Sequence, residues 1–439
     1  MQTIKYPQKQ DWARLLTRPT FDNSALTETV QSVLNDIKTR GDEAVKEYGL
    51  KFDKVQLSNL QVTENEISEA EKLISEKLKS AILLAKNNIE KFHAAQKYEL
   101  PKVETMPGVT CWQKAVAIEK VGLYIPGGTA PLFSTVLMLA IPAQIAGCKE
   151  IVLCSPPNKE GKIHPAVLFS ARVSGVTKIY KVGGIQAIGA MAYGTESLPK
   201  VYKIFGPGNQ YVTCAKQLVS LKDVAIDMPA GPSEVQVIAD HTANPAFVAA
   251  DFLSQAEHGA DSQSILITTS ETLVEQVVAE IEKQILLLPR VDLARKSLEN
   301  SKIIVLSTME EVIEMTNEYA PEHLIISTEN YREVAEKIIN AGSIFLGHLT
   351  PESAGDYASG TNHTLPTNGY AKAYSGVNLD SFVKKITFQE LTQEGLQNIG
   401  EAVEIMAENE GLVAHKNAIS LRMNKKINSH ATLWNKKTQ

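Results

Sequence analysis

A glutamine and a histidine near a predicted helix end have the residue types and spacing of metal ligands. The run NPAFVAADFLSQAEHG is predicted as one helix, started by a capping asparagine and a proline and ended by Gly259. Gln255 and His258 are three residues apart and would share a helix face. Two donors on one face could hold a metal ion, although an ordinary polar helix end has the same spacing.

An adjacent glutamate and histidine precede an apolar strand in APEHL. Adjacent side chains diverge on a regular element, but in a loop Glu322 and His323 can both reach one substrate. Such a pair can divide proton abstraction and water activation between its members. The alternative is a hydrogen-bonded surface pair.

The stretch ESAGDYASGTNHTLPT is a long polar loop with one acid pair, Glu352 and Asp356, and with His363 further along. Long ordered loops are often functional. Asp356 could also serve only to organise the turn. No HExxH or C-x-x-C motif is present, so the strong sequence signatures of zinc are absent.

Near the C-terminus, Glu410 and His415 flank the predicted helix break at Gly411. They are five residues apart, which is wrong for one face of a single helix. They can converge only if the chain turns at Gly411. Taken alone, the sequence around His415 predicts only a core or surface histidine.

Composition limits the classes of function. The chain has 439 residues, enough for roughly two to four domains. Its net charge is −6 without a long basic run, which argues against nucleic acid as a partner. Four cysteines without a C-x-x-C pair fit a reducing compartment. Because the N-terminus lacks an apolar signal core and the most apolar stretch is interrupted by Pro142 and Gln144, we expect a soluble cytoplasmic protein without a membrane partner.

The pattern of elements favours an α/β protein. Residues 24–98 have helical periodicity, with a break at Gly41 and one long amphipathic helix from 64 to 96 that places His93 on the surface. From about 115, short β-rich runs closed by glycine or proline alternate with helices. This alternation predicts two α/β blocks in tandem with mostly parallel sheets. From about 380 the pattern predicts helices only.

Glycine-rich turns follow three of the predicted strands, in PGG (126–128), VGG (182–184) and FGPGN (205–209). Open parallel sheets bind ligands beyond the carboxyl ends of their strands, so these turns could hold a nucleotide. They could equally be tight turns and nothing more. There is no G-x-G-x-x-G fingerprint, and the residues alone do not name NAD.

Together these motifs resemble the histidinol dehydrogenase family over nearly the whole chain. The stretches that carry the resemblance are VGLYIPGGTAPLFSTVLMLAIPA (121–143), VGGIQAIGAMAYGTES (182–197), KIFGPGNQYV (203–212), IDMPAGPSEV (226–235), LSQAEHG (253–259), PEHL (321–324), PESAGDYASGTNHTLPT (351–367) and ENEGLVAHKNA (408–418).

The resemblance implies an enzyme that oxidises L-histidinol to L-histidine through L-histidinaldehyde, with reduction of two NAD, as the last step of histidine biosynthesis. It implies a homodimer with one Zn²⁺ per subunit. The implied zinc ligands are Gln255, His258, Asp356 and His415, and Glu410 and His415 would reach the other subunit's site. Nitrogen and oxygen ligands from distant segments would explain the lack of a compact zinc motif.

The resemblance also assigns roles to residues. His323 would be the general base, and Glu322 would activate the water that attacks the aldehyde. The implied substrate contacts are Ser233, Gln255, His258, His323, Asp356, Glu410 and His415, and the implied NAD contacts are Tyr124, Gln186 and Asn209. His363 receives no definite role beyond support of its loop.

The implied fold has two incomplete Rossmann-like domains, of the type shared with aldehyde dehydrogenases, in an intertwined dimer. The expected parts are an N-terminal segment (1–18), a first domain (19–123 with 233–377) for zinc and substrate, a second domain (124–232) for NAD, and a C-terminal helical segment (378–439) that contacts the partner.

Two alternatives stay open. One is an enzyme that oxidises another small alcohol on the same scaffold. The other is a zinc-stabilised dimer that binds a metabolite without catalysis. The complete set of implied site residues argues against the first, and the intact pair of Glu322 and His323 argues against the second.

Overall fold

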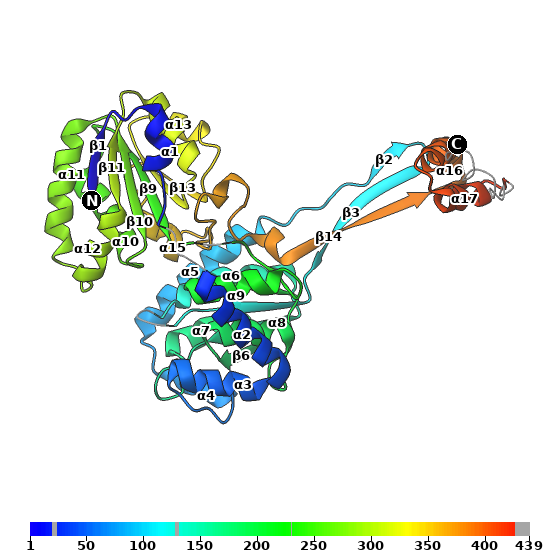
Figure 1. Ribbon diagram of the computed structural model, residues 1–439, viewed down its shortest axis with the longest axis horizontal. Helices are drawn as coiled ribbons and strands as arrows, with labels where there is room; N and C mark the ends of the chain where they lie inside the picture. The colour runs from blue at the N-terminus through cyan, green and yellow to red at the C-terminus, as the bar shows by residue number, and fades with distance from the viewer. Residues whose placement is uncertain (20–23, 128–130, 230, 426–439) are drawn as a thin grey trace. The chain divides into compact units, whose positions relative to one another are not determined.

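The computed structural model describes residues 1–19, 24–127, 131–229 and 231–425. It shows two compact units, the first formed by 1–97 with 117–382 and the second by 98–116 with 383–439 (Figure 1). Two parallel sheets flanked by helices make up the first unit, which confirms the predicted α/β class. Part of the predicted turn 126–128 and the end of the predicted C-terminal segment lie outside the described residues.

The first sheet has six parallel strands. Their spatial order is β1 (Gln2–Lys5), β11 (Lys302–Val305), β10 (Gln263–Thr268), β9 (Glu234–Ala239), β12 (His323–Ser327) and β13 (Ser343–Leu346). The central strands β9, β10 and β12 are buried along their whole length, as expected of a parallel sheet covered on both faces. The N-terminal segment therefore contributes an edge strand to this sheet.

Helices cover both faces of the six-stranded sheet (Figure 1). One face packs on α10 (Pro245–Ala256), α11 (Glu271–Ile285) and α12 (Val291–Asn300). The other face packs on α1 (Trp12–Leu15), α13 (Met309–Tyr319) and α14 (Tyr331–Glu336). Asn244 caps α10 by accepting from the backbone N–H of Ala246, as the sequence predicted.

The second sheet has five parallel strands. Their order is β6 (Lys178–Lys181), β5 (Glu150–Ser155), β4 (Lys120–Tyr124), β7 (Lys203–Phe205) and β8 (Ala225–Ile226). One face packs on α2 (Ser24–Arg40), α3 (Asp42–Tyr48), α8 (Gly184–Tyr193) and α9 (Gln210–Ser220). The opposite face packs on α4 (Glu64–Lys72), α6 (Phe133–Ala146) and α7 (Pro165–Val173), and α5 (Glu76–Ala94) packs on α6.

The N-terminal helices pack differently from the predicted grouping. The prediction joined residues 19–123 to 233–377, but α2 to α5 contact the helices of the five-stranded sheet, and β4 pairs within that sheet. The cause is their apolar faces, which supply part of the cores on the two sides of this sheet. Both sheets belong to one compact unit, so their division into two domains stays a prediction.

The second unit corrects the prediction of helices only after residue 380. It contains a three-stranded sheet in the order β14 (Val383–Leu391), β3 (Val109–Ala117) and β2 (Val103–Met106), followed by α16 (Gln393–Asn409) and α17 (Val413–Arg422). Trp112 of β3 stacks on Phe388 of β14, with ring centroids 5.3 Å apart. Residues 383–391 are therefore strand, because they pair with a segment far away in the sequence.

Two details of the N-terminal helices also differ from the prediction. The expected long helix from 64 to 96 is interrupted between α4 and α5, where the Ser75 hydroxyl accepts from the backbone N–H of Leu78 and starts a new helix. The prediction that His93 lies on the surface is wrong. It is fully buried in the same stripe as Ile89, whose carbonyl accepts from its Nδ1 at 2.8 Å.

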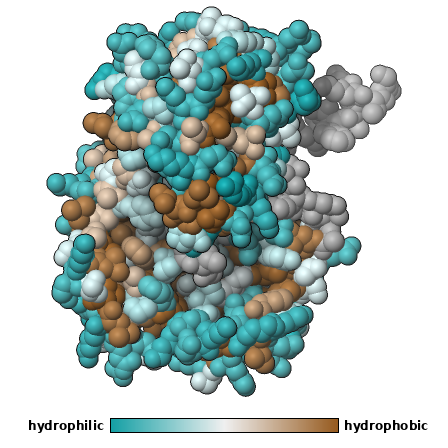
Figure 2. Space-filling model, turned by 90° about the vertical axis from the view of Figure 1, so that its left-hand side faces the viewer, coloured by the Kyte–Doolittle hydropathy of each residue, from teal (hydrophilic) through white to brown (hydrophobic). Residues whose placement is uncertain are grey.

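The remaining elements are short. They are η1 (Lys9–Asp11), the π-helix η2 (Gly49–Asp53), α15 (Glu352–Tyr357), η3 (Tyr370–Lys372) and η4 (Leu379–Phe382). Hydrophilic residues cover much of the face in Figure 2, and apolar residues gather there in separate patches. Among the described helices, none is both long and apolar enough to cross a membrane.

The turn after β7 leads to a testable prediction about stability. Gly206 has a φ of +124°, and a Cβ there would lie 2.1 Å from the carbonyl oxygen of Tyr124. We expect Gly206→Ala to lower the free energy of unfolding by about 2–5 kcal/mol, from backbone strain and overpacking together.

Gly147→Ala is the matched control, because Gly147 also has positive φ (+90°) but its Cβ would meet only Ala117 Cβ at 3.9 Å. We expect this variant to lose about 1–2 kcal/mol. Urea unfolding measures both, and equal losses in the two variants would contradict the proposed clash.

Candidate active site

The adjacent Glu322 and His323 lie at the start of β12 and are buried, each with 5% exposure. The parallel pairing of β12 with β9 places His323 beside Val235. The backbone N–H of Glu234 donates to Glu322 Oε2 at 2.9 Å, and its carbonyl accepts from His323 Nδ1 at 3.3 Å. One residue of β9 therefore orients both side chains and leaves His323 Nε2 as the ring nitrogen that the backbone does not engage.

Three carboxylates surround the His323 ring. Glu322 and Glu352 each place an oxygen 3.6 Å from Nδ1, and Asp356 places one 3.5 Å from Nε2. Glu352 and Asp356 lie four residues apart on α15, which brings them to one helix face. Sequence reasoning gave no role to Glu352, and this spacing was the signal that could have identified it.

The pKa values reflect this crowding of charge. Burial raises the pKa of Glu322 to about 7 and that of Glu352 to about 8. Burial by itself would lower the pKa of His323, but the carboxylates of Glu352, Glu322 and Asp356 hold it well above its usual value. Such a concentration of buried negative charge favours a cation in the site.

Nitrogen and oxygen donors suited to a metal ion converge next to this pair. His258, Glu352 and Asp356 each offer a ligand atom, and these atoms lie within 4.8 Å of one another. His258 is exposed at the cavity, but desolvation by the protein atoms around its ring lowers its pKa, which favours the neutral imidazole that metals bind. The helix α10 ends at Ala256, and His258 lies in the turn that follows it. The prediction had placed His258 inside the helix.

Several buried polar atoms have no hydrogen-bond partner among the described residues. They include both side-chain amide atoms of Gln255, both carboxylate oxygens of Glu352, and Nε2 of His323. Buried polar groups are normally paired, so these atoms are available to contact a metal ion or a ligand. The amide, carboxylate and imidazole groups at this place suit a metal ion, and they suit a polar ligand equally well.

His363 connects the polar loop to the second sheet's helices. Its Nδ1 donates to the backbone carbonyl of Asp356 at 2.9 Å, and its Nε2 lies 3.1 Å from Thr135 Oγ1 on α6. These two contacts link the end of α15 to α6, so His363 supports the polar loop.

A cavity of about 610 Å³ opens on these residues, a size suited to a small ligand and part of a cofactor. Its lining combines both sheets of the first unit. The five-stranded sheet contributes turns at its carboxyl edge, and the six-stranded sheet contributes residues at its amino edge; the predicted residues on this lining are Asn209, Ser233, His258, Glu322, His323 and Asp356.

Of the three residues expected to contact NAD, one lines the large cavity and two are buried. Asn209 lines the large cavity and caps α9 by accepting from the backbone N–H groups of Tyr211 and Val212. Tyr124 and Gln186 are buried instead. The Tyr124 hydroxyl accepts from the backbone N–H of Gly184 at 3.1 Å, and Gln186 Nε2 donates to Asp53 Oδ2 at 3.1 Å. Their contact with NAD stays a prediction.

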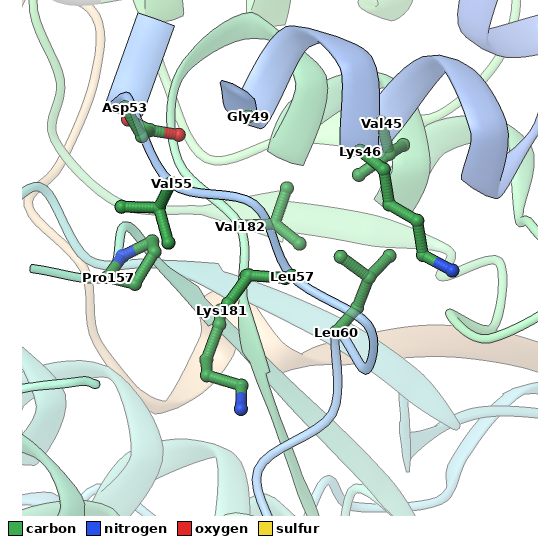
Figure 3. A pocket seen from close by; sticks show the side chains of 10 residues that line it. All are labelled: Val45, Lys46, Gly49, Asp53, Val55, Leu57, Leu60, Pro157, Lys181 and Val182. Atoms are coloured by element: carbon green, nitrogen blue, oxygen red, sulfur yellow. The ribbon is translucent and has the colours of Figure 1, made fainter. Parts of the chain in front are cut away.

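Asp53 also lines a second, much smaller cavity between η2 and the end of β6 (Figure 3). Its volume is about 10 Å³, room for a water molecule and too small for a nucleotide. Lys46, Lys181 and apolar side chains complete its lining.

The two predicted C-terminal site residues lie in the second unit. Glu410 is the C-cap of α16, and His415 lies on α17, after a turn at Gly411 with a φ of +75°. The break at Gly411 is confirmed. The part that Glu410 and His415 play in the site stays a prediction.

Two parallel sheets that meet at a polar cavity with a buried His–Glu pair define an α/β protein of the Rossmann-like class. The family model of histidinol dehydrogenase matches residues 16–423, and the chain belongs to this family.

Individual relatives agree. The histidinol dehydrogenase of Bacteroides thetaiotaomicron is 69% identical over 424 residues, which cover 97% of this chain and 99% of the relative. That of Escherichia coli K12 is 53% identical over 414 residues, 94% of each chain. The crystal structure of histidinol dehydrogenase from Elizabethkingia anophelis superposes with a TM-score of 0.95 at 57% identity, and the match covers 97% of this chain and 98% of that one.

A carboxylate on α10 leads to a prediction about pH and stability. Burial raises the pKa of Asp251, one turn before Gln255, to about 7. In the unfolded chain it ionises near pH 4, so the native state loses stability as pH rises from about 4 to 7. We expect Asp251→Asn to remove this loss and raise the free energy of unfolding at pH 8 by about 1–3 kcal/mol, after allowance for partial exposure.

Asp240→Asn is the control with the opposite sign. Burial would raise the pKa of Asp240, but hydrogen bonds from Thr242 and from the backbone N–H of Glu329 hold it below its usual value. Its ionised form therefore stabilises the fold at neutral pH, and the variant should be less stable than wild type at pH 8. Urea unfolding from pH 5 to 8 measures both variants, and a stability gain for Asp251→Asn that does not grow with pH would contradict the account.

Proposed function

We propose that the chain catalyses the last step of histidine biosynthesis, the NAD-dependent oxidation of L-histidinol to L-histidine through L-histidinaldehyde. Membership of the histidinol dehydrogenase family supports this proposal. The strongest structural support is the buried pair of Glu322 and His323, which the backbone of Glu234 orients and which lines the cavity. We refer to Glu322 and His323 as the catalytic pair.

In the first half-reaction, the proton of the substrate hydroxyl goes to His323 Nε2 as the carbon–hydrogen bond breaks. The contact of Nδ1 with the carbonyl of Glu234 fixes the ring so that Nε2 is the accepting atom. In the second half-reaction, Glu322 takes a proton from the water that adds to the aldehyde. His323 then accepts the hydroxyl proton of the hydrate as its carbon–hydrogen bond breaks and the acid forms. NAD supplies the hydride acceptor in each half-reaction.

The donor set fits Zn²⁺, one per subunit, with Gln255, His258 and Asp356 as ligands from the first unit. The unpartnered amide atoms of Gln255 and the convergence of His258 and Asp356 support this assignment. The ion would orient the substrate and offset the negative charge that keeps His323 protonated. Glu352 belongs to the same cluster and is a further candidate ligand.

We further propose a cytoplasmic homodimer in which Glu410 and His415 complete the partner's site, with His415 as the fourth zinc ligand. Their place in the separate second unit supports a role outside the chain's own core. All four cysteines are free, which suits the reducing cytoplasm.

Replacement of the proposed base tests the function. His323→Asn removes the proton acceptor at nearly constant size, so we expect kcat to fall by about 10²–10⁴-fold. Histidinol should still bind. Initial rates of NADH formation and calorimetric binding measure the two effects.

His348→Asn is the matched control for a hydrogen-bonded histidine, because the Nδ1 of His348 lies 2.8 Å from Ser327 Oγ at the other end of β12. It should keep its activity. Unchanged turnover by His323→Asn would refute the base. Binding without turnover by the wild type would favour a metabolite-binding dimer, and turnover of other amino alcohols only would favour a different substrate.

Glu352 gives a separate prediction about the metal. Glu352→Gln keeps the shape of the side chain and removes a carboxyl group that a bound zinc ion would hold in its ionised form, so we expect zinc affinity to fall by about 10–100-fold. Dialysis against graded chelator, followed by metal analysis, measures the affinity. Glu329→Gln is the control, because Glu329 lies just past the other end of β12. Equal zinc retention in the two variants would exclude Glu352 from the metal site.

A further inference from the structure

We propose that Arg18, at the end of the N-terminal segment, is a positioning residue that holds the catalytic pair in place through Glu234. This inference rests on the proposed oxidation of histidinol. Among the described residues that line the 610 Å³ cavity, Arg18 is absent. Any effect of Arg18 on the substrate must therefore pass through the residues that it contacts.

The first contact is a forked ion pair with the Glu234 side chain. Arg18 Nε donates to Glu234 Oε2, and Nη2 donates to Oε1 at 3.1 Å. The Tyr319 hydroxyl also donates to Oε2 at 2.8 Å. The Glu234 side chain is only 2% exposed, so these donors take the place of the water that its carboxylate lacks.

The second contact joins Arg18 to the end of α13. Its Nη2 donates to the carbonyl oxygen of Tyr319 at 2.6 Å and reaches that of Ala320 at 3.4 Å. The guanidinium carbon lies 3.9 Å from the centre of the Tyr319 ring. Ala320 has a φ of +53°, a left-handed conformation that is costly for a residue with a Cβ and needs support from its surroundings.

These two contacts reach both segments that carry the site. The chain runs from Ala320 through Pro321 directly into the catalytic pair. On the other side, Glu234 is the first residue of β9, and its backbone N–H and carbonyl hold Glu322 and His323. A single guanidinium thus fixes the spacing between the turn that supplies the catalytic pair and the backbone that orients it.

The planar fork of arginine is what this position requires. It donates to a carboxylate and to backbone carbonyls at once while it stacks on an aromatic ring. A lysine has one charged nitrogen and no planar face, so it could satisfy only part of this set.

The test measures chemistry separately from folding. For Arg18→Gln we expect kcat to fall by about 100-fold through misplacement of the base, with the KM for histidinol within about threefold of wild type. With histidinol deuterated at the carbinol carbon, the isotope effect on kcat should rise, because carbon–hydrogen cleavage becomes slower. Zinc content should not change.

Three further variants complete the experiment. Arg18→Lys should lose about 10-fold in kcat and serves as the readout if Arg18→Gln fails to fold. The double variant Arg18→Gln/Glu234→Gln should be no slower than Arg18→Gln alone, since both residues act through one contact. Arg40→Gln is the control: Arg40 makes a forked pair with Asp36 on α2, and its loss should leave kcat and the isotope effect unchanged.

The outcomes separate the inference from the function on which it rests. A wild-type kcat for both Arg18 variants, or a loss that matches the unfolded fraction with no change in isotope effect, would overturn the role of Arg18. Absence of histidinol oxidation by the wild-type protein would overturn the proposed function and the inference with it.

Discussion

The backbone of Glu234 is the constraint on which the candidate site depends. It is the first residue of β9, and it holds Glu322 by its N–H and His323 by its carbonyl. Parallel pairing of β9 with β12 sets this contact, and the two strands are buried throughout. The position of the His–Glu pair therefore follows from the buried core of the six-stranded sheet.

Around this pair the site gathers more carboxyl groups than its own cationic side chains can balance. Glu322, Glu352 and Asp356 all approach His323, and burial raises the pKa of the first two. The partnerless atoms of Gln255 and Glu352 lie in the same region of the fold. A cation would relieve both problems, and the proposed zinc is a physical answer to the charge as well as an expectation from the family.

Much of the fold and site could be predicted from the sequence. Glycine and proline boundaries gave most strands of the first unit, and the helix break at Gly41 and the cap at Asn244 are confirmed. Glu322, His323, His258, Asp356, Ser233 and Asn209 all line one cavity, although they come from distant segments. These residues belong to long motifs, which made them recognisable.

What could not be predicted depends on contacts that are remote in the sequence. The strand β14 is almost wholly exposed and lacks a buried alternating face, so only its pairing with β3 defines it. Helices α2 to α5 pack around the five-stranded sheet, but the apolar periodicity that predicts these helices does not say which sheet they cover. Arg18 and Glu234 are ordinary charged residues until the fold brings them together across 216 positions of sequence.

The proposal of a two-step oxidation is tested most directly by the amount of NADH formed per histidinol consumed, with purified zinc-loaded protein and excess NAD. The account predicts two NADH for each histidinol, with histidine as the product, because the catalytic pair would serve both half-reactions. One NADH per histidinol, with release of the aldehyde, would contradict the role given to Glu322 and the four-electron reaction itself.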